Sequence, residues 1–422
     1  MHGTSASHQI PFTRYDAGWV ILCIGMAIGA GIVFLPVQVG ITGLWVFAAS
    51  VLLAYPALYM MQELYLKTLA ESDECDDYAS IITQYLGKNW GFVLGVAYSL
   101  MLLKGMLTYS LAVTFDSAKY LQTFGITDSL LSNNALYSLA VLSFLVLIAA
   151  QGERLLFKIS GPLVIFKLGV VVLLGAVMIP YWDIKNNIPA FPDVKQFAID
   201  TILTVPFTLF SILFVQILSP MNIAFRRAEP ESRIATYRAI RANRIAFLIL
   251  AISVLFFAVS FTFALSHEQA LSAKAQNISA LALAASVIPA NAVLFMTTAL
   301  NIFAIVTAFL GIYLGFEEGL AGMAMNLMTR FTPKEKISRR MVTFGVAVFI
   351  VVALWLWVRI QFSILLLQQI ASPIYGIISF IIPCLLVYKV AALHKYKSLK
   401  LFYVFAFGVL LCMSPVLKAL GY

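Results

Sequence analysis

The chain alternates between long apolar runs and short polar connections along most of its length. A helix needs about 20 apolar residues to cross the hydrocarbon layer of a membrane, and most of these runs have that length. We predict eleven membrane-spanning helices, at residues 18–39, 43–66, 90–115, 135–150, 159–180, 202–224, 244–265, 290–315, 341–358, 363–388 and 401–418. The pattern therefore predicts an all-α polytopic membrane protein.

The composition agrees with a chain that is embedded in lipid. Hydrophobic residues make up 62% and charged residues 11% of the 422 positions, which leaves too little polar surface for a soluble protein of this size. We therefore expect one transmembrane domain, 1–422, in the lipid bilayer. The net charge of +9 does not indicate nucleic-acid binding, because the basic residues are spread between the apolar runs.

The lysines and arginines also predict an orientation. They lie mainly in the connections on the same side as the N-terminus, and short cytoplasmic loops carry an excess of these residues. We expect a multi-pass protein of the bacterial inner membrane with a cytoplasmic N-terminus and a periplasmic C-terminus. The oligomeric state is not indicated.

The first predicted span contains an unusual cluster of helix-weakening residues. Gly25, Gly29 and Gly31 lie close together and Pro36 follows them. Glycine weakens a helix interior and proline removes a backbone donor, so we expect a break here. A break in hydrocarbon leaves peptide groups unpaired unless protein, water or a ligand pairs with them, so it predicts a binding site. The alternative is that the glycines only allow close helix packing.

The sixth predicted span carries a second set of such signals, Pro206 and the pair Ser219-Pro220. Breaks in spans 1 and 6 are the pattern expected of two five-span inverted repeats. We expect spans 1–5 (18–180) and spans 6–10 (202–388) to form the repeats, with span 11 (401–418) added. Half-helix N-termini in such a fold face an anionic group such as an amino-acid carboxylate.

Two lysines lie inside predicted spans. Lys167, in span 5, is at a depth where an ammonium group is costly. A lysine that loses its proton in one conformation and regains it in another is a candidate for coupling transport to protons instead of sodium. The alternative is that its side chain reaches back to the membrane surface. Lys104, in span 3, has the same ambiguity without a neighbour that favours coupling.

Several neutral polar residues also lie at membrane depth, where each is a candidate for helix contacts or for binding a ligand. They are Tyr109, Ser110, Gln216, Thr297, Thr298, Asn301 and Thr307. Thr297, Asn301 and Thr307 have spacings that predict one polar stripe on span 8 facing the centre of the bundle.

Enzymatic functions find no support in the sequence. All four histidines lie outside the predicted spans, and neither a metal-ligand spacing nor a Walker loop or nucleophile elbow occurs. We predict no enzyme activity, no metal site and no cofactor, with a proton gradient as the driving force.

Three segments resemble the hydroxy and aromatic amino acid permease family of bacterial proton symporters. They are Gly25 to Pro36 (GMAIGAGIVFLP), the pair Ser219-Pro220, and Thr307 to Gly319 (TAFLGIYLGFEEG). That family is similar to the amino acid–polyamine–organocation superfamily, whose fold is a five-plus-five inverted repeat like that of the leucine–sodium symporter. The resemblance covers the whole chain.

The resemblance implies a set of site residues. The amino and carboxylate groups of the substrate would meet the broken backbone of span 1, at Ala27, Ile28, Gly29, Ala30 and Gly31, and that of span 6, at Phe210, Ser211, Phe214 and Gln216. Tyr109 would stand near the substrate, Lys167 would replace sodium, and Thr307 would lie near the same ion site. We add Asn301 as a substrate-binding candidate because of its place on the polar stripe of span 8.

One departure from the family guides the substrate prediction. Serine and threonine carriers of the family tend to have Asn-His before the Ser-Pro of span 6, whereas this chain has Ile217-Leu218. A less polar pocket disfavours a hydroxyl group, so we predict proton-coupled import of an aromatic amino acid such as tryptophan. The alternatives are symport of serine, threonine or another neutral amino acid and, from another class, a non-transporting membrane sensor or a passive channel.

Overall fold

A computed structural model describes residues 10–71, 78–150, 153–184, 191–288, 291–329, 331 and 337–421. All regular secondary structure in these ranges is helical. The first half of the chain forms α1 (Arg14–Ala27), α2 (Ala30–Thr42), α3 (Leu44–Ala70), α4 (Tyr78–Leu86), α5 (Lys88–Thr123), α6 (Ala135–Ala149) and α7 (Glu153–Val177), with short helices η2 (Leu131–Asn133) and η3 (Ile179–Tyr181).

The second half continues in the same way. It forms α9 (Val194–Phe210), η4 (Val215–Ile217), α10 (Leu218–Ala228), α11 (Ser232–Ala264), α12 (His267–Ala275), α13 (Ala280–Val287), α14 (Asn291–Met328), α15 (Arg339–Arg359), α16 (Ile364–Tyr375), η6 (Gly376–Ile381), α17 (Ile382–Lys389), η7 (Ala391–Tyr396) and α18 (Leu399–Ala419).

Eight of the described helices are long and apolar enough to cross a membrane, and the count is ten if each of two bent helix pairs is one span. The bent pairs are α1 with α2 and α9 with α10, the predicted spans 1 and 6. The all-α membrane fold with two broken spans is thereby confirmed. The predicted fourth span, α6, has only 15 residues, so the count of eleven stays a prediction, as do the repeat boundaries.

Three segments differ from the predicted pattern. A helix, α4, lies in the connection after span 2, and the connection before span 8 holds two short helices, α12 and α13. Span 10 is not one regular helix, because a π-helical stretch, η6, joins α16 to α17. Such stretches occur frequently at functional sites.

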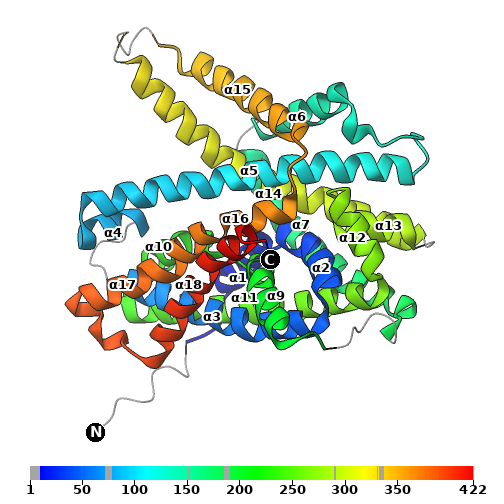
Figure 1. Cartoon of the computed structure of the whole chain (residues 1–422). Helices are drawn as coiled ribbons and strands as arrows, with labels where there is room; N and C mark the ends of the chain where they lie inside the picture. The colour runs from blue at the N-terminus through cyan, green and yellow to red at the C-terminus, as the bar shows by residue number, and fades with distance from the viewer. Residues whose placement is uncertain are drawn as a thin grey trace.

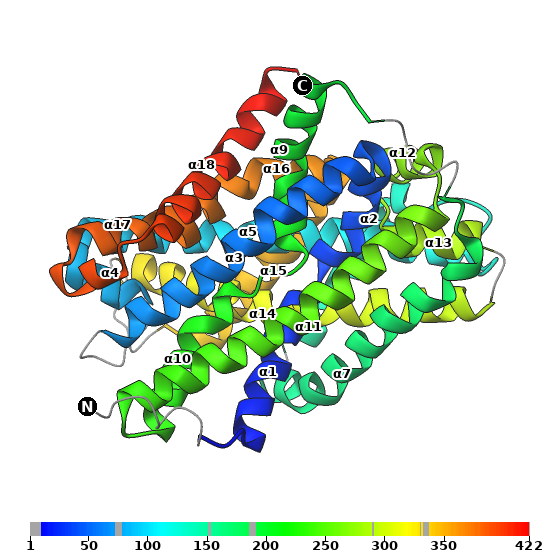
Figure 2. The same ribbon diagram turned by 90° about the horizontal axis from the view of Figure 1, so that it is seen from below.

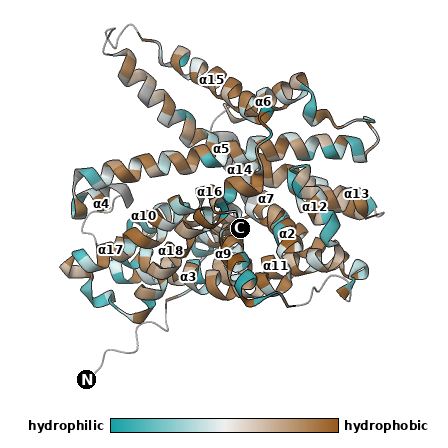
Figure 3. Cartoon of the chain, viewed as in Figure 1, coloured by the Kyte–Doolittle hydropathy of each residue, from teal (hydrophilic) through white to brown (hydrophobic). Residues whose placement is uncertain are grey.

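The long α5 crosses the molecule in Figure 1, with α6 and α15 on one side of it and α1, α3, α9 and α11 on the other. Seen from below, in Figure 2, α3 and α11 run diagonally across the bundle, and both pack beside the broken spans. Apolar residues dominate the long helices in Figure 3, whereas hydrophilic ones gather toward helix ends and connections. This distribution fits a bundle with its long helices in lipid.

Candidate functional site

The first span breaks at Ile28 and Gly29, inside the glycine cluster. α1 ends at Ala27, α2 begins at Ala30, and the two helices meet at an angle of 49°. Gly29 precedes α2 and has no side chain that could accept a hydrogen bond from the first amides of that helix. The N-terminus of α2 is therefore open to an anionic group.

The sixth span breaks after Phe210, where α9 ends, and the bend to η4 and α10 is 40°. Pro206, which predicted the break, lies inside α9, and Pro220 lies inside α10. The break therefore falls between the two prolines and contains neither proline nor glycine.

The two breaks touch each other through their backbones. A Cβ atom at Gly31 would collide with the carbonyl oxygen of Phe210 and would lie 3.0 Å from the backbone nitrogen of Ser211. Only glycine at position 31 allows the two broken segments to cross this closely. The structure thus brings together the two segments that the sequence predicted to form one site.

Tyr109 of α5 lies on the same crossing. Its hydroxyl oxygen would be 2.5 Å from a Cβ atom at Gly29, and Ala308 of α14 packs on the same point. The phenol therefore stands beside the open N-terminus of α2.

Lys167 of α7 reaches the break in span 1 from the other side. Its ammonium group donates to the carbonyl oxygens of Gly25, at 3.3 Å, and Ile28, at 3.2 Å, and to the hydroxyl oxygen of Thr307, at 3.2 Å. Lys167 is 2% exposed, so its side chain is directed into the protein and not toward the membrane surface. The ammonium group of Lys167 thus has three oxygen acceptors, two from the first span and one from α14.

The second lysine within a span, Lys104 of α5, lies at the other break. Its ammonium nitrogen is 4.1 Å from the centre of the Phe210 ring and 5.6 Å from that of Tyr375, in α16. The sequence alone does not single out Lys104 as a functional residue, because its neighbours in the fold come from distant parts of the chain.

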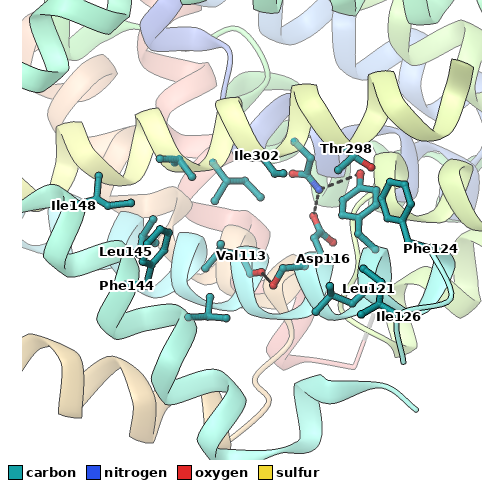
Figure 4. A pocket seen from close by; sticks show the side chains of 16 residues that line it. Val113, Asp116, Leu121, Phe124, Ile126, Phe144, Leu145, Ile148, Thr298 and Ile302 are labelled. Atoms are coloured by element: carbon teal, nitrogen blue, oxygen red, sulfur yellow. Dashed lines mark hydrogen bonds between the residues drawn. The ribbon is translucent and has the colours of Figure 1, made fainter. Parts of the chain in front are cut away.

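Asn301 does not lie with these residues. Its amide nitrogen donates to the carboxylate of Asp116, at 2.6 Å, and the backbone N–H of Ser279 donates to the same carboxylate, at 2.8 Å. Figure 4 shows Asp116 on α5 facing α14. The amide nitrogen of Asn301 also donates to the hydroxyl oxygen of Tyr120, at 3.4 Å. The cluster borders a cavity of about 460 Å³ whose other lining residues are mainly apolar.

The polar stripe predicted on α14 therefore does not serve one site, because Thr307 faces Lys167 whereas Asn301 faces Asp116. Asp116 itself was missed. It lies one residue beyond the end predicted for span 3, whereas α5 continues to Thr123 and buries it to 2% exposure. If the predicted span 3 had been extended to the true end of α5, Asp116 would have stood out as a carboxylate inside a span, which marks a candidate functional residue.

The remaining predicted residues lie at the two breaks with different exposures. The side chains of Ala27, Ser211 and Phe214 are buried. Gln216 is half-buried in η4, and its side-chain oxygen has no hydrogen-bond donor among the described residues. Ala30 is the first residue of α2. Within the described ranges, no group of three or more histidine, cysteine, aspartate or glutamate side chains could hold a metal ion.

Comparison with curated proteins gives relatives along the full chain. The chain is 49% identical over 411 residues to a probable serine transporter of Escherichia coli K12, covering 97% of this chain and 93% of the relative. It is 26% identical over 409 residues to the serine transporter SdaC of the same strain, covering 93% and 92%. No family model matches the chain.

Among solved structures, the crystal structure of MhsT in complex with L-phenylalanine matches with a TM-score of 0.54 at 13% identity. The match covers 96% of this chain and 97% of MhsT, so the fold is shared along the whole length. At this identity the likeness concerns the fold alone.

The names of the curated relatives do not support the aromatic substrate that we predicted. That prediction rested on Ile217, which is half-buried, and on Leu218, which is fully buried in the hydrophobic core. The relatives are named as transporters, so the protein is not an enzyme. The chain belongs to the family of bacterial amino acid transporters that contains these serine transporters.

Proposed function

We propose that the protein is a proton-coupled symporter of a hydroxy amino acid, serine or threonine, in the bacterial inner membrane, with its N-terminus in the cytoplasm. The names of the curated relatives, serine transporter and threonine/serine transporter, support the substrate class. The contact of Lys167 with the break in span 1 supports proton coupling and is the observation on which the proposal depends.

The substrate lies where the two breaks cross. Its carboxylate faces the first amides of α2, beside the phenol of Tyr109, because a helix N-terminus without a side-chain cap favours an anion. At the break in span 6, the side-chain oxygen of Gln216 lacks a donor among the described residues. A substrate with a hydroxyl or ammonium donor would satisfy it, and leaving it unpaired costs about 1–3 kcal/mol.

Lys167 carries the proton. In its charged form the ammonium group donates hydrogen bonds to Gly25 and Ile28 of span 1 and to Thr307 of α14. These bonds hold the broken helix against α7 and α14. Loss of the proton removes the charge that these oxygens stabilise and weakens the link. The position of span 1 therefore depends on the protonation of one buried amine, which is what a proton symporter requires.

Uptake by purified protein in liposomes tests this function. Labelled serine should accumulate with an inward proton gradient and should not do so with an inward sodium gradient at equal pH. Unlabelled threonine should compete with serine, whereas tryptophan should not. Accumulation that follows the sodium gradient would contradict proton coupling, and competition by tryptophan alone would contradict the substrate class.

A further inference from the structure

We propose that Lys104 forms an anion subsite at the break in span 6 and binds the carboxylate of the transported amino acid. This inference rests on the proposed function, since it assigns one more contact to the same substrate. Lys104 lies in the middle of α5, five residues before Tyr109, and is half-buried.

The ammonium group of Lys104 has no anionic partner in the described part of the chain. Its interactions there are with the faces of two aromatic rings, Phe210 and Tyr375. Phe210 is the last residue of α9, and Tyr375 is the last residue of α16, directly before the π-helical stretch. Both rings thus mark points where a spanning helix loses its regular structure.

The two rings form one wall behind the ammonium group. Their centres are 4.7 Å apart and their planes meet at 71°, so the edge of one ring contacts the face of the other. Aromatic faces attract a cation, but they provide no hydrogen-bond acceptor strong enough to replace water around an ammonium group. The side chain is positioned by this wall while its hydrogen-bonding capacity stays open.

Phe210 connects Lys104 to the proposed substrate site. The carbonyl group of Phe210 contacts Gly31, the second residue of α2, so the Phe210 ring links Lys104 to the crossing of the breaks. The first turn of α2 and the ammonium group of Lys104 therefore both contact Phe210. A carboxylate there would be bound by backbone amides and by a full positive charge.

A comparison with Lys167 shows why the ligand must supply the anion. The ammonium group of Lys167 has three oxygen acceptors, whereas that of Lys104 has none within the described ranges. A cation at membrane depth needs compensation, and such residues mark substrate and ion pathways. The bound carboxylate provides this compensation, and Lys104 is a specificity-determining residue for substrates that carry one.

Binding of L-serine and L-serinamide to the purified full chain in detergent tests the proposal, because serinamide lacks the anionic carboxylate. By calorimetry, Lys104→Met should weaken serine binding by about 10- to 100-fold, the range expected for a hydrogen bond to a charged group. The affinity for serinamide should change less than about threefold, since it loses no ion pair. Lys104→Arg should retain the preference for serine.

Lys119→Met is the matched control, since Lys119 lies on the same helix and bonds to Gln122, and it should leave both affinities unchanged. Equal weakening of serine and serinamide, or no weakening of either, would overturn the subsite and indicate a structural lysine. If Lys104→Met does not give folded protein, Lys104→Gln provides the same comparison with a neutral polar side chain. A wild-type protein that binds no amino acid would instead contradict the proposed function.

Discussion

The ammonium nitrogen of Lys167 lies 3.2 Å from the carbonyl oxygen of Ile28, the residue at which the first span loses its helical hydrogen bonding. The two residues are 139 positions apart in the sequence. Through this contact, a titratable group on α7 stabilises the backbone of a broken helix that also borders the proposed substrate site. Substitution of Lys167, which removes the donor, should therefore affect the proposed coupling.

The crossing of the two breaks predicts a strict requirement for glycine at position 31. In Gly31→Ala, the new Cβ atom would collide with the carbonyl group of Phe210, which cannot rotate away as a side chain can. We expect the free energy of unfolding to fall by about 1–3 kcal/mol, as for other overpacked sites, and serine binding to be lost. Thermal unfolding and calorimetry measure the two effects.

Gly345→Ala in α15 is the control for this substitution, because nothing lies within 4 Å of a Cβ atom at that position. It should be neutral or should stabilise the helix by up to about 1 kcal/mol. Unchanged serine binding in Gly31→Ala would contradict the assignment of the crossing to the substrate site.

The carboxylate of Asp116 links the connection before α14 to the spanning helices. It accepts hydrogen bonds from Ser279, the residue directly before α13, and from Asn301 of α14. Asp116→Ala leaves the backbone N–H of Ser279 unpaired and removes the shortest hydrogen bond of the Asn301 amide, so it should lower the free energy of unfolding by about 1–3 kcal/mol. Amide hydrogen exchange at Ser279 should become faster, whereas the control Asp128→Ala, at an exposed aspartate, should change neither quantity.

A pH effect is expected where η7 contacts the end of α3. Burial acts to raise the pKa of Glu71, but hydrogen bonds from Lys395, at 2.6 Å, and Tyr396, at 2.7 Å, outweigh it and hold the pKa below its ordinary value. A lowered folded-state pKa stabilises the fold at neutral pH, and this contribution is lost as the pH falls below about 4.3. Because Lys395 is 55% exposed, we expect less than about 1 kcal/mol.

Melting temperatures of the wild type and Glu71→Gln measure this effect as a function of pH. The two proteins should differ at pH 7 and converge in acid. Glu268→Gln, at an exposed glutamate of α12, should match the wild type throughout. A difference between the wild type and Glu71→Gln that grows in acid would contradict a lowered pKa of Glu71.

The sequence predicted the break in span 1 correctly because glycine and proline weaken a helix through their own chemistry, independent of neighbours. The break in span 6 lies at residues 211–214, within the stretch from Phe210 to Gln216 that the resemblance implied. The local signals were less accurate, because Pro206 fits inside α9 and Pro220 fits inside α10. The contacts of Lys104 with Phe210 and Tyr375 were beyond reach, since they depend on how three distant helices pack. Asp116 was missed for a simpler reason, namely that the apolar run ends before α5 does.

The coupling role of Lys167 can be measured directly in liposomes that contain a pH-sensitive dye and carry no imposed pH gradient. External serine should acidify the lumen of wild-type liposomes, since the proposed symport carries protons in together with serine. Lys167→Met should exchange labelled serine across the membrane without acidifying the lumen, and Lys119→Met should behave like the wild type. Serine entry without proton entry in the wild type, or full acidification by Lys167→Met, would contradict proton coupling through Lys167.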